Sequence, residues 1–174
     1  MERCDVLVVG GGPAGSSTAL GLRSSGLDVL LLDRADFPRD KPCAGWVTPS
    51  VLTALGIDAD RYAAAHTFQP ITGFRIRRIG DREAFIGSRE PISYGILRCE
   101  CDHYLLERCG ARLRLGERVH SIDRDPSRER WVVNGAIEAR ILIGAGGHFC
   151  PVARHVLSDR EPREIAILAQ EAEY

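Results

Sequence analysis

The sequence contains a single lysine, Lys41, although lysine and arginine together number 23. A phosphate-binding site would therefore depend on arginine side chains or on backbone N–H groups. The formal net charge is −1, which argues against a chain that binds nucleic acid through a basic surface. No apolar run approaches the roughly 20 residues that a membrane-spanning helix needs. These scarcities leave an ordinary globular protein, and 174 residues suffice for one well-packed domain.

Cysteine pairs with metal-ligand spacing are also lacking. The six cysteines include no Cys-x-x-Cys pair, and their scatter does not match a zinc site, so we expect no metal. No secretory leader precedes the first apolar run. We therefore expect free thiols and a reducing, cytoplasmic setting. The cysteines stand at positions 4, 43, 99, 101, 109 and 150.

What the sequence does contain is a glycine-rich turn between two apolar runs near its start. Residues 4–9 (CDVLVV) and 28–33 (DVLLLD) read as strands of a parallel sheet, buried on both faces. Residues 16–26 read as a helix that ends near a glycine. Together they form one βαβ unit whose turn, GGGPAG, carries three glycines in the Gly-x-Gly-x-x-Gly spacing.

Each position of that turn has a mechanical role in binding a dinucleotide. Gly10 permits the tight turn, Gly12 lets a pyrophosphate approach the main chain, and Gly15 lets the helix sit close to the strands. The helix N-terminus then offers free N–H groups to the phosphates. Asp33 ends the second strand, where a carboxylate can accept hydrogen bonds from an adenosine ribose. We count Pro13 and Ala14, within the same turn, among the cofactor-binding residues; these features fit NAD and FAD equally.

Residues 34–50, RADFPRDKPCAGWVTPS, form an irregular loop with three prolines, and long loops in compact domains are usually functional. This stretch resembles the loop that follows the flavin in the geranylgeranyl reductase family. That family belongs to the FAD-dependent oxidoreductases shaped like para-hydroxybenzoate hydroxylase. The resemblance implies FAD as the cofactor, with Cys43, Ala44 and Gly45 beside the flavin ring and with Arg34 among the cofactor contacts.

Two further stretches are similar to this family. In residues 94–106, Arg98 and Asp102 occupy the two fixed positions of an Arg-x-x-x-Asp motif, which implies that Arg98 reaches the FAD phosphates or ribityl hydroxyls. In residues 142–157 a strand leads into a second glycine turn with Gly146 and Gly147. Relatives usually carry an aspartate where Gly146 stands, so only backbone N–H groups could make that flavin contact here.

The resemblance also implies how the middle of the chain folds. Residues 111–115 read as a third parallel strand, followed by an antiparallel meander and by a return strand ending near residue 144. Backbone at Val119, after the third strand, would cradle adenine. The expected fold class is therefore α/β: a Rossmann-like FAD-binding domain with a parallel sheet, a β-meander crossover and part of an antiparallel substrate-domain sheet. The expected domains are residues 1–70 and 95–160 for FAD binding, and residues 71–94 and 161–174 for strands of an incomplete substrate domain.

The resemblance implies an FAD-dependent oxidoreductase that reduces an alkene, in particular a prenyl chain, with NAD(P)H as the candidate electron donor. The substrate would be a small molecule or a prenyl lipid, and a lipid would bring peripheral membrane contact; the oligomeric state stays open. No acid–base pair or nucleophile demands a catalytic role, so no catalytic residue is assigned. Two alternatives remain: a flavin-dependent monooxygenase or halogenase, and a non-catalytic nucleotide-binding fragment.

Overall fold

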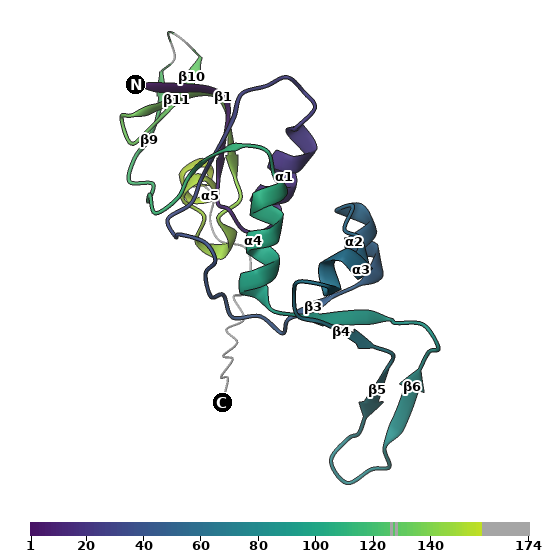
Figure 1. The fold of residues 1–174 in the computed structure, drawn as a ribbon. Helices are drawn as coiled ribbons and strands as arrows, with labels where there is room; N and C mark the ends of the chain where they lie inside the picture. The colour runs from purple at the N-terminus through teal and green to yellow at the C-terminus, as the bar shows by residue number, and fades with distance from the viewer. Residues whose placement is uncertain (126, 128, 158–174) are drawn as a thin grey trace. The chain divides into compact units, whose positions relative to one another are not determined.

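The structure, a computed structural model, describes residues 1–125, 127 and 129–157 (Figure 1). The chain divides into two compact units. The first unit joins Met1–Arg39 to Asp102–Tyr174, and the second is Asp40–Cys101. The domain boundaries expected from the sequence stay a prediction, and its strand at 161–174 lies outside the described residues.

A six-stranded sheet with the order β8-β2-β1-β11-β10-β9 forms the centre of the first unit. The pairs β8–β2, β2–β1 and β1–β11 are parallel, while β11–β10 and β10–β9 are antiparallel. After β8 the chain forms the antiparallel strands β9 and β10 and returns as β11, which pairs with β1 on the side opposite β2. This arrangement confirms the expected α/β fold. The strands are β1 (Glu2–Val9), β2 (Val29–Leu32), β8 (Arg112–Arg114), β9 (Ile122–Asp125), β10 (Arg130–Val133) and β11 (Ile137–Gly144).

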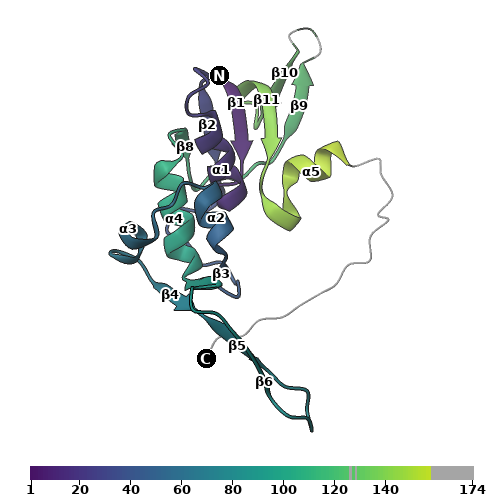
Figure 2. The same ribbon diagram turned by 90° about the vertical axis from the view of Figure 1, so that its right-hand side faces the viewer.

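Both faces of this sheet are covered, which explains the unbroken apolar runs of β1 and β2. Successive side chains of a strand point to opposite faces. Val6 and Val8 pack on one face, with Ala19 of α1 and Leu106 of α4. The other face packs Leu7 and Val9 of β1 against the meander and α5 (Figure 2). The helices of this region are α1 (Pro13–Leu22), α4 (Arg98–Arg108) and α5 (Pro151–Val156), with a 3-10 turn, η1 (Gly147–Phe149).

The second unit contains a three-stranded antiparallel sheet, in the order β3-β7-β4, and a separate hairpin of β5 and β6. The sequence predicts strands within residues 71–94, and β5, β6 and the start of β7 lie there. The elements are β3 (Trp46–Val47), α2 (Pro49–Ala54), α3 (Ala59–Ala63), β4 (Phe68–Ile71), β5 (Gly73–Ile76), β6 (Ala84–Gly87) and β7 (Ser93–Ile96).

One expected helix and one expected loop differ from the structure in their bounds. The helix expected over 16–26 begins at Pro13 and ends at Leu22. The loop expected over 34–50 ends earlier, because α2 begins at Pro49 and continues to Ala54. In both cases proline occupies the first turn, where it loses no hydrogen bond and its fixed φ suits a helix. Within the described residues, no helix is both long and apolar enough to cross a bilayer.

Candidate functional site

Two glycines of the turn after β1 lie in close contact with the protein's own backbone. Gly10 has φ of 116°, a conformation that side chains strongly disfavour. A Cβ atom at Gly10 would overlap the Ala145 carbonyl oxygen and lie 2.7 Å from the Gly146 nitrogen. A Cβ atom at Gly15 would overlap the Gly10 carbonyl oxygen. These two glycines are therefore required by the packing of α1, β1 and the turn after β11.

Gly12 differs from its neighbours because the space around it is open. The nearest atom to a Cβ built there is Nη2 of Arg39, at 3.4 Å. Gly12 is also the N-cap of α1, and no side chain caps this helix. The first-turn N–H groups of Ala14 and Gly15 have no intrahelical partner, and Pro13 has no N–H. The turn thus presents bare backbone donors with room for a ligand, as a pyrophosphate requires.

Asp33 links the end of β2 to the glycine turn. Its carboxylate accepts hydrogen bonds from Gly11 N at 2.6 Å and from Ala35 N at 2.9 Å. Each bond uses a different oxygen, and a carboxylate oxygen can accept a second bond. The half-buried Asp33 therefore orients the turn and retains capacity for a ribose hydroxyl, whose binding stays a prediction. Arg34, the next residue, is exposed.

The second glycine turn lies against the first. Ala145 N donates to Val9 O at 2.8 Å, so residues 145–147 begin at the same edge of the sheet as Gly10. Gly147 has φ of 71° and no atom within 4 Å of a built Cβ. At Gly146, by contrast, a Cβ would stand 3.1 Å from Cys150 Cα. A side chain at position 146 would therefore require Cys150 to shift by a few tenths of an ångström.

Arg39 is a candidate that the sequence analysis missed. Its Nη2 lies beside Gly12 and 3.4 Å from Oδ2 of Asp102, a fully buried carboxylate of α4. Its guanidinium also stands 4.8 Å from the centre of the Phe37 ring. Among the residues that the structure describes, Nη1 of Arg39 is buried without a hydrogen-bond partner. A buried guanidinium N–H beside an open backbone cradle suits a phosphate; no spacing pattern in the sequence marks this arginine.

Replacing Arg39 with methionine is expected to weaken FAD binding by about 10- to 100-fold. The reason is that one hydrogen bond to a charged group contributes about 1.5–3 kcal/mol. Methionine keeps the apolar contact with Phe37 and removes the charge. The measurement is quenching of flavin fluorescence on titration. Arg23→Met, at the exposed C-cap of α1, is the matched control; an equal effect of the two variants would contradict the assignment.

The second unit carries the other expected flavin contacts, Cys43, Ala44, Gly45 and Arg98. Gly45 has φ of 61°, and a Cβ there would lie 2.5 Å from Ile96 O. Gly45 O also accepts a hydrogen bond from Ile96 N at 2.7 Å, so this stretch is held against the end of β7. Ala44 is exposed, and Arg98 begins α4. The arrangement leaves small residues and bare backbone along this part of the loop.

Cys43 has a distinctive electrostatic environment. A hydrogen bond from the Arg98 side chain, followed by backbone N–H groups of Gly45 and Trp46, lowers the pKa of the Cys43 thiol. The opposite holds at Cys4, where burial raises the thiol pKa to about 11. Because thiolate is the reactive form, the two cysteines should differ in reactivity at neutral pH.

Alkylation by iodoacetamide tests this contrast. The rate at Cys43 is expected to rise with pH along a curve whose midpoint lies below that of N-acetylcysteine, because a lowered pKa leaves more thiolate at each pH. Cys4 should stay unmodified across the same range. Peptide mass spectrometry gives the site-specific rates, and Arg98→Met should move the Cys43 midpoint upward. A Cys43 midpoint at or above that of N-acetylcysteine would refute the proposed role of Arg98.

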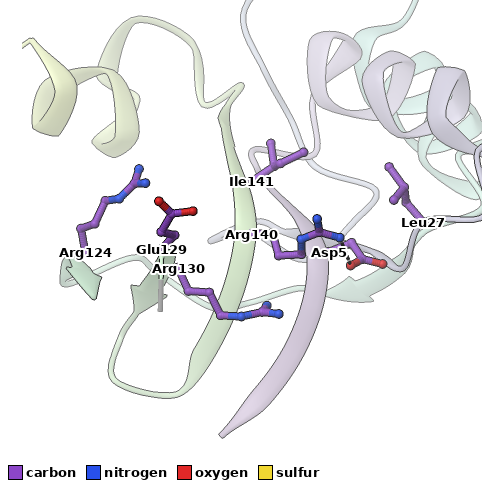
Figure 3. A pocket seen from close by; sticks show the side chains of 7 residues that line it. All are labelled: Asp5, Leu27, Arg124, Glu129, Arg130, Arg140 and Ile141. Atoms are coloured by element: carbon purple, nitrogen blue, oxygen red, sulfur yellow. Dashed lines mark ion pairs between the residues drawn. The ribbon is translucent and has the colours of Figure 1, made fainter. Parts of the chain in front are cut away.

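A hollow of about 430 Å³ lies on the first unit (Figure 3). Asp5 pairs with Arg140 at 3.5 Å, and the Asp28 N–H and Arg140 together lower the pKa of Asp5. Arg124 lies over the Trp131 ring at 4.9 Å. None of the expected site residues lines it; those that do are Asp5, Leu27, Arg124, Glu129, Arg130, Arg140 and Ile141.

The residues around the first glycine turn fit FAD. The cradle at Gly12 has space for a pyrophosphate, and the unpartnered N–H of Arg39 supplies a cationic donor next to it. The structure brings Gly10, Gly12, Gly15, Asp33 and the 145–147 turn to one edge of one sheet. The candidates at 43–45 and Arg98 belong to the other compact unit. Within the described residues, no cluster of side chains could hold a metal ion.

Comparison with known proteins confirms FAD as the cofactor of this family. The family model described as "FAD binding domain" matches residues 3–168. Menaquinone reductase of Mycobacterium tuberculosis is 33% identical over 171 residues, covering 88% of this chain and 40% of its own. Geranylgeranyl diphosphate reductase of Rhodobacter capsulatus is 32% identical over 171 residues, covering 91% of this chain and 41% of its own. A flavin-dependent halogenase of Metacordyceps chlamydosporia is 33% identical over 134 residues, covering 75% and 25%.

A solved structure shows the same fold. It is a geranylgeranyl bacteriochlorophyll reductase-like protein of Thermoplasma acidophilum, with a TM-score of 0.68 and 24% identity, covering 84% of this chain and 40% of that one. The chain thus spans about 40% of the length of the two reductases. On the match of its sequence and fold, the chain belongs to the family of FAD-binding oxidoreductases that includes the geranylgeranyl reductases.

Proposed function

We propose that this chain is the FAD-binding portion of a flavin-dependent reductase whose substrate is an alkene, in the first instance the prenyl chain of a lipid. The observation that carries the cofactor part is the open backbone cradle at Gly12 beside the buried Arg39 N–H. Support for the reaction comes from relatives named for geranylgeranyl diphosphate and for menaquinone. A prenyl lipid would be met at a membrane surface, as a peripheral contact.

The chain's own residues have binding and orienting roles in this proposal. Backbone N–H groups of the first turn of α1 and the Arg39 guanidinium hold the diphosphate, and Asp33 accepts from a ribose hydroxyl. Small residues at 43–45 let the main chain approach the flat flavin ring, and Arg98 reaches the phosphates or the ribityl chain. When bound, FAD supplies the hydride chemistry. NAD(P)H is the proposed source of the electrons.

The decisive experiment mixes a reduced holoprotein with candidate acceptors in the absence of oxygen. The chain is first loaded with FAD and reduced anaerobically with NADH or NADPH. Geranylgeranyl diphosphate or menaquinone is then added, and flavin absorbance and product mass are followed. Return of the oxidised spectrum supports the proposal when the product is two mass units heavier and fragmentation places both added hydrogens in the prenyl chain. Reduction of the menaquinone ring to the quinol adds the same mass and would not support it. Failure to bind FAD at all would leave the non-catalytic alternative and overturn the proposal.

The halogenase relative makes one alternative specific enough to test in parallel. The same reduced protein is mixed with oxygen, chloride and a phenolic acceptor. A chlorinated or hydroxylated product, with no alkene reduction, would assign the chain to the oxygen-using flavoproteins. Rapid reoxidation of the flavin by oxygen that yields only hydrogen peroxide would not support this alternative.

A further inference from the structure

Val119 lies in the connection between β8 and β9. Its side chain packs against the core on the meander face of the sheet. Across the described part of the chain, neither its N–H nor its carbonyl oxygen makes a hydrogen bond. One residue thus offers a donor and an acceptor side by side. Val119 lies outside the strands, so strand pairing does not fix the position of this irregular segment.

The side chain of Asn134 makes hydrogen bonds with the residues before and after Val119. Its Oδ1 accepts from His120 N at 2.7 Å and from Ser121 N at 3.3 Å. Its Nδ2 donates to Arg118 O at 2.9 Å and to Oε1 of Glu117 at 3.3 Å. Asn134 is the only asparagine of the sequence and has φ of 55°, which asparagine tolerates better than most residues. With Gly135 at φ of 62° it forms the tight turn between β10 and β11.

These bonds fix the direction in which the Val119 groups point. The peptide plane before Val119 carries Arg118 O and Val119 N–H on opposite sides, and the plane after it carries Val119 O and His120 N–H. Because a trans peptide is planar, holding Arg118 O and His120 N toward Asn134 turns both Val119 groups away from it. One side chain therefore aims a donor and an acceptor outward together.

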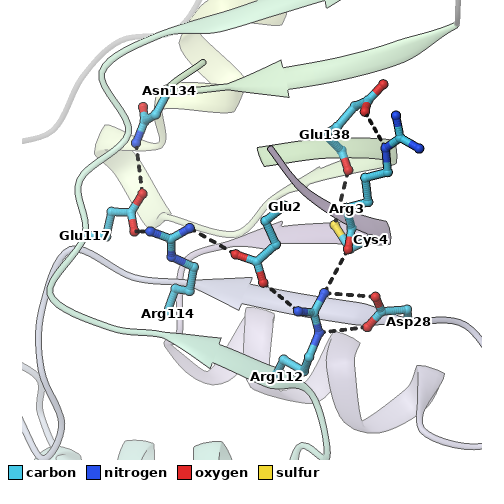
Figure 4. A network of polar contacts seen from close by, with 9 residues as sticks. All are labelled: Glu2, Arg3, Cys4, Asp28, Arg112, Arg114, Glu117, Asn134 and Glu138. Carbon is cyan, nitrogen blue, oxygen red and sulfur yellow. Dashed lines mark hydrogen bonds and ion pairs between the residues drawn. The ribbon is translucent and has the colours of Figure 1, made fainter. Parts of the chain in front are cut away.

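The Asn134 side chain is connected to the strands of the sheet through Glu117. Glu117, which accepts from Asn134, also pairs with Arg114 of β8 at 2.5 Å. Arg114 in turn bonds Glu2 of β1 at 3.0 Å, and Arg112 extends the network to Glu2 and Asp28 (Figure 4). The segment around Val119 is thus connected through Asn134 and Glu117 to β8 and β1.

We propose that Asn134 is a positioning residue that selects adenine at this site. This inference rests on the proposed binding of FAD. The adenine edge presents an amino donor at N6 next to an acceptor at N1, which matches a carbonyl and an N–H from one residue. Hypoxanthine reverses that pattern, with an acceptor at O6 and a donor at N1. The outward Val119 pair would therefore accept adenine and reject hypoxanthine.

The test compares FAD with flavin hypoxanthine dinucleotide in the wild-type chain and in Asn134→Gly. Glycine retains the left-handed backbone at position 134 and removes only the side chain. The wild type should bind FAD about tenfold more tightly than the analogue, the order expected from a single hydrogen bond lost or opposed. Asn134→Gly should bind FAD about tenfold more weakly and the analogue nearly unchanged, so that the preference disappears. Asn134→Asp, which keeps the acceptor for His120 N and Ser121 N, should retain part of it.

A change in the ratio of the two affinities is a readout that simple loss of stability would not produce. Ser25→Ala is the matched control, because it also removes side-chain bonds to two backbone groups at a turn of the same unit; it should leave the ratio unaltered. Equal weakening of both ligands by Asn134→Gly, or no weakening, would overturn the role of Asn134 alone. Absence of FAD binding in the wild type would overturn this inference and the proposed function together.

Discussion

Gly12→Val is expected to fold and to lose FAD, with an affinity at least about 100-fold lower than the wild type, or about 2.7 kcal/mol. The backbone at position 12 has φ of −71° and ψ of −175°, an extended conformation open to valine. The one atom near a new Cβ is the flexible end of Arg39, at 3.4 Å. The added side chain would instead fill the space that the pyrophosphate needs, so the protein should stay folded while the ligand is excluded.

Two measurements separate these effects. Titration of flavin fluorescence gives the affinity, and thermal unfolding without ligand gives the stability, which should fall by no more than about 1 kcal/mol because valine is a poor N-cap. Gly21→Val is the control: it lies in the same helix with no atom within 4 Å of its Cβ. FAD binding by Gly12→Val at wild-type strength would move the diphosphate away from this turn.

The first half of the fold could be predicted from the sequence because its signals are local and mutually consistent. The apolar runs of β1 and β2, the glycine spacing between them and the acidic residue after β2 all indicate one βαβ unit. The meander was predictable only through the family resemblance, since β9 and β10 are four residues each and their pairing depends on contacts with β11. Helix bounds were less accurate because the prolines at 13 and 49 start helices rather than interrupt them.

The candidate site was predictable to the extent that it consists of backbone. Gly10 and Gly15 mark positions where packing excludes a side chain, and Gly12 marks an open position between them. The Gly-x-Gly-x-x-Gly spacing records all three. The contributions of Arg39 and Asn134 could not be read in the same way. Arg39 reaches Gly12 from 27 positions along the chain because buried Asp102 holds it there. Asn134 reaches Arg118 O because the meander folds back. Such contacts depend on tertiary structure, which has no fixed spacing in the sequence.

Gly15→Ala should destabilise the fold itself, by about 3 kcal/mol or more, even though it adds one methyl group. A Cβ at Gly15 would overlap the Gly10 carbonyl oxygen and lie 3.3 Å from Ala145 Cβ. Gly10 cannot move aside readily, because it ends β1 and its N–H donates to Leu32 O at 2.8 Å. Helix α1 would have to shift outward, which would loosen the packing of buried Ala19 against Val6 and Val8.

Thermal unfolding without ligand measures this effect, and the midpoint should fall by roughly 6–12 °C for a chain of this size. Gly21→Ala, in the same helix with open space around it, should raise the midpoint slightly, because alanine favours a helix by about 1 kcal/mol over glycine. A Gly15→Ala midpoint within about 2 °C of the wild type would contradict the close approach of α1 to β1. Since Gly12→Val should lose FAD without this fall in stability, the two variants together distinguish the glycine that admits the diphosphate from the glycine that lets the helix pack.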